Sequence, residues 1–138
     1  MTPEETRTRF ATAPVARLAT ADSTGRPHIV PIVFAAEGDT IFTAVDGKPK
    51  RSARLKRLDN IATNQNVSVL SDEYTEDWSR LWWARADGIA EVLLRGSTRY
   101  EHGLDLLVDR YPQYQTERPG GPVISIRVYR WSGWVATA

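Results

Sequence analysis

The chain has 138 residues, of which 41% are hydrophobic and 25% charged, and its net charge is +1. This length and composition predict one soluble globular domain over residues 1–138. The small net charge excludes bulk attraction to nucleic acid or to an anionic membrane, and the lack of cysteine excludes disulfides and thiolate chemistry. The polar start and the lack of a long apolar run predict a cytoplasmic protein without a membrane span.

The first third of the chain predicts a short helix followed by strands. Thr2 and Pro3 are typical of a helix cap and first helical position, so we expect a helix to about Ala11. The runs "VARLATAD" and "HIVPIVF", separated by "STGRP", predict a hairpin, and "TIFTAV" predicts the third strand of a meander. Pro31 has no N–H for a ladder, so it should face an edge, a bulge or an open site.

The next segment, "DGKPKRSARLKRLD" at residues 46–59, holds six of the eighteen cations. Leu55, Leu58, Ile61 and Ala62 recur at helical spacing, which predicts an amphipathic helix over residues 50–64 with its cations on the other faces. A solvated helix face is one interpretation. However, the cations begin before the helix and continue through its first turns, where backbone N–H groups favour anions, so we predict phosphate binding. The six cations are Lys48, Lys50, Arg51, Arg54, Lys56 and Arg57.

The second half predicts long strands around one helix. "VSVLSD" is a typical strand, and "LWWARADGIAEVLL" indicates either one long strand or a pair of strands bent near Asp87 and Gly88. "VISIRVYRWSGW" alternates as a final strand. Between them, Ser97 should cap a helix that ends by Tyr111, followed by a loop. Five to seven mainly antiparallel strands with two to three helices indicate a small β-barrel with helical covers.

Few side chains suggest direct chemistry. The two histidines lie in separate elements and are interpreted as satisfied polar groups, so no metal site is predicted. The acidic residues around Tyr74 and Trp78 are interpreted as a solvated loop, and no catalytic side chain is predicted. Trp82 and Trp83 must point to opposite faces of a strand, so one should face a ligand or a subunit, or cover an exposed barrel face.

The stretches "VARLAT", "GRPHIVPIVF" and "GDTIFTAVDGKPKRSARLKRLDNIATNQNVSVL" resemble the pyridoxamine 5′-phosphate oxidase-like split β-barrel family. Within it, "KPK", "RLDNI" and "DWSRLWWARADGIAEV" are similar to the branch of probable enzymes dependent on the deazaflavin coenzyme F420. The "NQN" stretch departs from the Asn-Pro of the family pattern. The resemblance implies a mainly β split barrel and a homodimer with cofactor sites at its interface.

The resemblance also implies a cofactor site. The strand with Val30, Pro31 and Ile32 would pass beside the cofactor ring through its backbone. The phosphate would be held by the cations that match the family's basic positions. Arg51 and Arg54 are added on charge alone, and Trp78 is added as an aromatic residue that contacts the cofactor. The matching cations are Lys48, Lys50, Lys56 and Arg57.

The implied function is hydride transfer from reduced coenzyme F420 to an electron-poor small molecule. FMN has one phosphate monoester, whereas F420 has a phosphodiester and a glutamate tail, so a row of cations favours F420. An FMN-dependent oxidase or reductase and a non-catalytic flavin-binding or F420-binding protein remain as alternatives. Because the chemistry belongs to such a cofactor, the protein need only bind, orient and exclude water.

Overall fold

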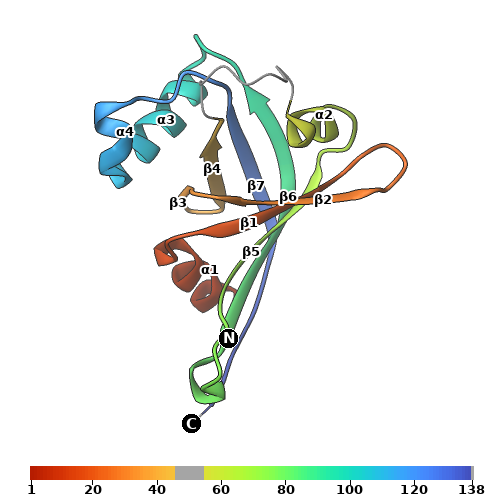
Figure 1. Cartoon of the computed structure of the whole chain (residues 1–138), viewed down its shortest axis with the longest axis vertical. Helices are drawn as coiled ribbons and strands as arrows, with labels where there is room; N and C mark the ends of the chain where they lie inside the picture. The colour runs from red at the N-terminus through yellow and green to blue at the C-terminus, as the bar shows by residue number, and fades with distance from the viewer. Residues whose placement is uncertain (46–54, 138) are drawn as a thin grey trace.

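The computed structural model describes residues 1–45 and 55–137. The described strands form one seven-stranded antiparallel sheet in the order β2-β1-β5-β6-β7-β4-β3, which coils without closing (Figure 1). The helices are α1 (Pro3–Thr12), α2 (Lys56–Thr63), α3 (Thr98–Arg110), α4 (Pro112–Thr116) and the 3₁₀ turn η1 (Trp78–Arg80). The strands are β1 (Ala16–Ala21), β2 (Pro27–Ile32), β3 (Ala35–Glu37), β4 (Thr40–Ala44), β5 (Asn66–Glu73), β6 (Trp82–Leu93) and β7 (Val123–Val135).

Most of the predicted elements are confirmed, as is the mainly β split barrel. Thr2 caps α1 by accepting from the Glu5 N–H at 3.1 Å, and Ser97 caps α3 in the same way. The β1–β2 hairpin forms, and β6 is one strand whose register against β7 shifts at Asp87 and Gly88. Pro31 lies on β2, which is an edge strand, as its missing N–H requires.

The predicted three-strand meander is wrong at its third strand. β4 pairs with β3 and β7 at the opposite edge of the sheet, not with β2. Residues 33–34 carry the chain from β2 at one edge of the sheet to β3 at the other edge. They pass through the interior of the coiled sheet, where Phe34 is fully buried. Local turn signals do not reveal this crossing, since β7 lies about eighty positions later in the sequence.

Two helix predictions also need correction. The described part of the basic helix begins at Lys56, because Leu55 has an extended backbone with φ −86° and ψ 140°. Its buried face includes Asn60 and Ile61, whereas Ala62 is exposed. A fourth α-helix, α4, occupies part of the predicted loop, because proline is well tolerated at the first helical position.

The core consists of two clusters on opposite faces of the sheet. The larger cluster fills the inner face, where Phe10 of α1 and Ile61 of α2 pack against the strands. The smaller cluster lies under α3, where Leu104 and Leu107 pack against Phe42 of β4. None of the described helices is long and apolar enough to cross a membrane.

A polar clamp holds the crossing between β2 and β3. Arg110 donates to the backbone oxygen of Phe34 at 2.6 Å and to that of Ala13, and its guanidinium lies 4.8 Å from the centre of the Phe34 ring. The Tyr111 hydroxyl accepts from the Phe34 N–H at 3.0 Å and donates to its oxygen at 2.7 Å. The end of α3 therefore fixes residues 33–34, which connect β2 at one edge of the coiled sheet to β3 at the other edge.

Candidate functional site

A cluster of polar side chains lies where the start of α2 packs on the inner face of the β1–β2 hairpin. Thr20 and His28 are directly opposite each other in the antiparallel pair, so their side chains share one face. Asn60 Nδ2 donates to Thr20 Oγ1 at 2.9 Å, and Arg57 lies one helical turn before Asn60. We name these four residues the inner-face cluster.

Three buried polar atoms of this cluster have no hydrogen-bond partner among the described residues. They are His28 Nδ1, Arg57 Nε and Asn60 Oδ1. Burial lowers the pKa of the Arg57 guanidinium from its usual value, so desolvation disfavours its charge in the absence of an anion. Unpaired buried donors cost free energy, and a bound anion would satisfy the two nitrogens if His28 carries its proton on Nδ1.

The start of α2 adds to this preference for anions. Leu55 supplies no side-chain cap, and the N–H groups that lie before Leu58 are at the positive end of the helix dipole. The exposed Lys56 is close enough to the β1–β2 turn to help lower the pKa of Asp22. That pKa is about 2, mainly because Thr24 donates from its hydroxyl and Arg26 from its backbone N–H.

The strand residues predicted to lie beside a cofactor ring divide between two faces. Val30 and Ile32 pack on the core side, where Ile32 is buried, whereas Pro31 is exposed on the outer face. Their place at a ring stays a prediction. Lys48, Lys50, Arg51 and Arg54 lie outside the described residues.

Trp78 lies far from the inner-face cluster within one chain. Its side chain is 77% exposed in η1, and Figure 1 places η1 at the opposite end of the long axis from α2. Trp82 and Trp83 do point to opposite faces, because Trp82 is buried in the inner cluster and Trp83 lines a pocket on the outer face.

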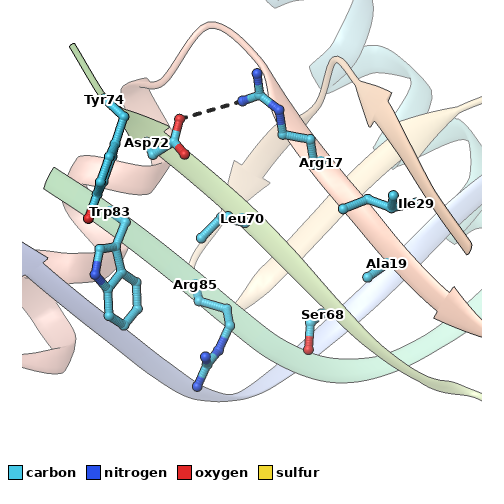
Figure 2. A pocket seen from close by; sticks show the side chains of 9 residues that line it. All are labelled: Arg17, Ala19, Ile29, Ser68, Leu70, Asp72, Tyr74, Trp83 and Arg85. Carbon is cyan, nitrogen blue, oxygen red and sulfur yellow. Dashed lines mark ion pairs between the residues drawn. The ribbon is translucent and has the colours of Figure 1, made fainter. Parts of the chain in front are cut away.

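This outer-face pocket crosses β2, β1, β5 and β6 and has a volume of about 410 Å³ (Figure 2). Arg17 pairs with Asp72 at 3.6 Å along one side, and Trp83 and Arg85 line the other. Sequence reasoning missed the pocket because its residues come from four strands and from the loop after β5. The lining residues are Arg17, Ala19, Ile29, Ser68, Leu70, Asp72, Tyr74, Trp83 and Arg85.

Asp87 lies next to this pocket, and its carboxylate keeps its negative charge. Burial raises its pKa, but Ser68 Oγ, which donates at 2.6 Å, and Arg130 outweigh that effect, so the pKa lies below its usual value. Arg130 donates to the second carboxylate oxygen at 3.0–3.1 Å. Asp87 is therefore a structural anion and an unsuitable general acid at neutral pH.

Sequence reasoning also missed the inner-face residues His28, Thr20 and Asn60. His28 was interpreted as a satisfied polar group, whereas one of its ring nitrogens is buried without a partner among the described residues. The strand alternation that places His28 on the same face as Val30 was a usable signal. No group of ligating side chains among residues 1–45 and 55–137 could hold a metal ion.

Solved structures with this fold come from several bacteria. A conserved hypothetical protein of Mycobacterium tuberculosis has a TM-score of 0.77 and 17% identity over 98% of this chain and 85% of that chain. A FAD-binding protein of Mesorhizobium loti has a TM-score of 0.72 and 20% identity over 96% of this chain and 94% of that chain. The heme storage protein HutZ of Vibrio cholerae has a TM-score of 0.71 and 16% identity over 96% of this chain and 90% of that chain. At these identities the likeness shows the fold alone.

No curated protein matches the chain by sequence. The family described as pyridoxamine 5′-phosphate oxidase matches residues 2–135. That match covers both faces of the sheet and all of the inner-face cluster. The chain therefore belongs to the pyridoxamine 5′-phosphate oxidase family.

Proposed function

We propose that this chain is an oxidoreductase that binds a flavin-type cofactor through the inner-face cluster, with coenzyme F420 as that cofactor. The observation that carries the proposal is a pair of buried nitrogens, His28 Nδ1 and Arg57 Nε, that have no hydrogen-bond partner among the described residues, together with the uncapped start of α2. A phosphate fits this donor set, because its oxygens accept from charged side chains and from helix N–H groups together.

The choice of a flavin-type cofactor is supported by family membership and by the FAD-binding neighbour from M. loti. The choice of F420 rests on the basic sequence at residues 46–59, which suits a phosphodiester with an acidic tail better than one phosphate. When bound, such a cofactor supplies hydride transfer. Arg57 and His28 would hold its phosphate, and the edge strand β2 would orient the rest.

A non-catalytic binding role is the second candidate. HutZ of V. cholerae shares the fold and is a heme storage protein, so the fold serves proteins whose names indicate storage. A binding protein would take up its ligand and give no turnover with any acceptor. Turnover of reduced cofactor with quinone, imine and activated-alkene acceptors separates the two roles.

We expect the purified, cofactor-free protein to bind F420 more tightly than FMN when both are titrated side by side. More charge pairs form with the tailed cofactor, so its affinity should also fall more steeply with salt. Fluorescence of each cofactor gives the two dissociation constants. Tighter binding of FMN would replace F420 by FMN in the proposal, and binding of neither would overturn it.

We propose that the chain forms a homodimer through the aromatic arm, defined by Tyr74, Trp78 and Trp134. These side chains are 59%, 77% and 42% exposed where the sheet extends beyond its helices, and exposed aromatics of this density are typical of interfaces (Figure 1).

Light scattering should therefore give twice the chain mass of 15.5 kDa at micromolar concentration. The double variant Tyr74→Ser with Trp78→Ser should give a monomer. Leu94→Ser, at a residue 67% exposed outside the arm, is the control and should stay dimeric. A parent protein that is monomeric at micromolar concentration contradicts the proposal.

A further inference from the structure

Asn60 has a buried amide oxygen whose hydrogen-bonding capacity is not used by any described residue. The side chain belongs to a residue that is 1% exposed, and its Nδ2 donates to Thr20 Oγ1 at 2.9 Å. Thr20 is itself buried, so this bond holds the amide in one orientation. Asn60 Oδ1 is buried and accepts from no described residue. Because an unsatisfied buried acceptor costs free energy, a group that donates to this oxygen should stabilise the site.

A phosphate alone does not satisfy this oxygen. Phosphate oxygens can accept from Arg57 Nε, and from His28 Nδ1 when that nitrogen carries the ring proton; both nitrogens are buried without a partner among the described residues. However, an ionised phosphate presents only acceptors, and Asn60 Oδ1 is an acceptor too. Arg57 lies one helical turn before Asn60, so an anion held by Arg57 lies close to this oxygen. A ligand that completes the inner-face cluster therefore carries a donor beside its phosphate.

A hydroxyl group is the donor that fits this place. An ammonium group would be repelled by Arg57, by the exposed Lys56 and by the positive end of the α2 dipole. A hydroxyl is neutral, and it can donate to Asn60 Oδ1 while it stays next to the anion. A hydroxyl on the carbon that follows the ester carbon lies nearest to the phosphate. Ligands with this arrangement are phosphate esters of polyols.

We propose that Asn60 is a specificity-determining residue of the inner-face cluster. Its Oδ1 accepts from a hydroxyl group next to the phosphate of the ligand, so the site selects polyol phosphates over alkyl phosphates. This inference rests on the proposed function, because it takes Arg57 and His28 as the phosphate contacts. It adds a choice that the cations alone cannot make, since both kinds of phosphate carry the same charge.

The test compares two phosphates that differ by one hydroxyl group, propane-1,2-diol 1-phosphate and propyl phosphate. The cofactor-free protein is titrated with each at millimolar concentration and followed by nuclear magnetic resonance. We expect the diol phosphate to bind at least about five-fold more tightly. Asn60→Leu keeps a similar volume without the acceptor, so its two affinities should agree within about two-fold. Asn64→Leu makes the same change after the last turn of α2 and should keep the ratio of the parent.

The ratio of the two affinities is the readout, because a purely structural role of Asn60 would weaken both phosphates alike. Asn60→Ala, which introduces no larger side chain, gives the same comparison if leucine disturbs the packing of α2. A ratio that persists in both Asn60 variants overturns the proposal.

Equal affinities in the parent also overturn it, and would mean that an ordered water satisfies Oδ1 or that the amide presents Nδ2 to the phosphate. If those equal affinities both fall in Arg57→Ala, the phosphate site of the proposed function stands without this inference. Binding of neither phosphate would contradict both.

Discussion

Arg57→Ala should weaken cofactor binding by roughly ten- to a hundred-fold while leaving the fold intact. Each charge-assisted hydrogen bond to a phosphate contributes about 1.5–3 kcal/mol, and Arg57 presents a buried donor that no described residue satisfies. Arg57→Lys should fall between the parent and the alanine variant, because it keeps the charge but loses the planar donor fork. Fluorescence titration with F420 and with FMN measures both losses.

Two further variants make this result specific to the inner-face cluster. His28→Phe should also weaken binding, since it removes the second buried nitrogen that no described residue satisfies. Arg118→Ala is the control for lost positive charge, because that side chain pairs with Asp105 and Glu101 of α3. On charge grounds we expect Lys50→Ala, outside the described residues, to weaken binding similarly. If Arg57→Ala and Lys50→Ala bind F420 as the parent does, the basic segment is only a solvated surface.

Arg110→Met is expected to lower the free energy of unfolding by about 2–4 kcal/mol, as two backbone carbonyls lose a charged donor. Methionine keeps much of the aliphatic stem against Phe34, so the loss reports chiefly the hydrogen bonds to Phe34 and Ala13. Urea unfolding with an unchanged slope gives this free energy.

Arg95→Met is the matched control for this measurement. Arg95 is exposed in the turn after β6, and substitutions of that kind usually change stability by less than about 0.5 kcal/mol. Tyr111→Phe should show a smaller loss than Arg110→Met, because it removes a neutral hydroxyl. Equal stability of Arg110→Met and Arg95→Met would mean that the clamp contributes nothing.

Elements with complete local signals could be predicted from the sequence. Thr2 with Pro3 located α1, Ser97 located α3, and the run from Leu81 to Leu94 indicated β6 with an irregularity near Asp87 and Gly88. Each signal acts within a few residues, so no tertiary knowledge was needed.

The features that were missed depend on contacts between distant residues. β4 joins β7 because the buried Phe34 carries the chain through the interior, and nothing near Thr40 encodes that partner. The helix predicted over residues 50–64 included Leu55 because of its helical spacing to Leu58, but Leu55 is extended and α2 begins at Lys56.

The candidate site was predictable only in part for the same reason. Charge density pointed to Lys56 and Arg57, but His28 joins them only because α2 packs over the β1–β2 hairpin through the Asn60–Thr20 hydrogen bond. The outer-face pocket needs four strands in register, with Leu70 opposite both Arg17 and Arg85. Such cross-strand neighbours have no fixed spacing in a sequence.

The pairing of β4 with β7 also sets the order in which the strands of the sheet can pair during folding. During synthesis β1 and β2 can form a hairpin early, but Thr40–Ala44 must wait for Val123–Arg127 before its second edge is covered. Sheets completed by such remote pairings fold slowly, because much chain entropy is lost before the contacts form. Until then, β4 exposes Ile41 and Phe42 on a strand with unpaired N–H and C=O groups, which is a template for intermolecular association. Nascent or C-terminally truncated chains should therefore depend on chaperones more than the folded protein does.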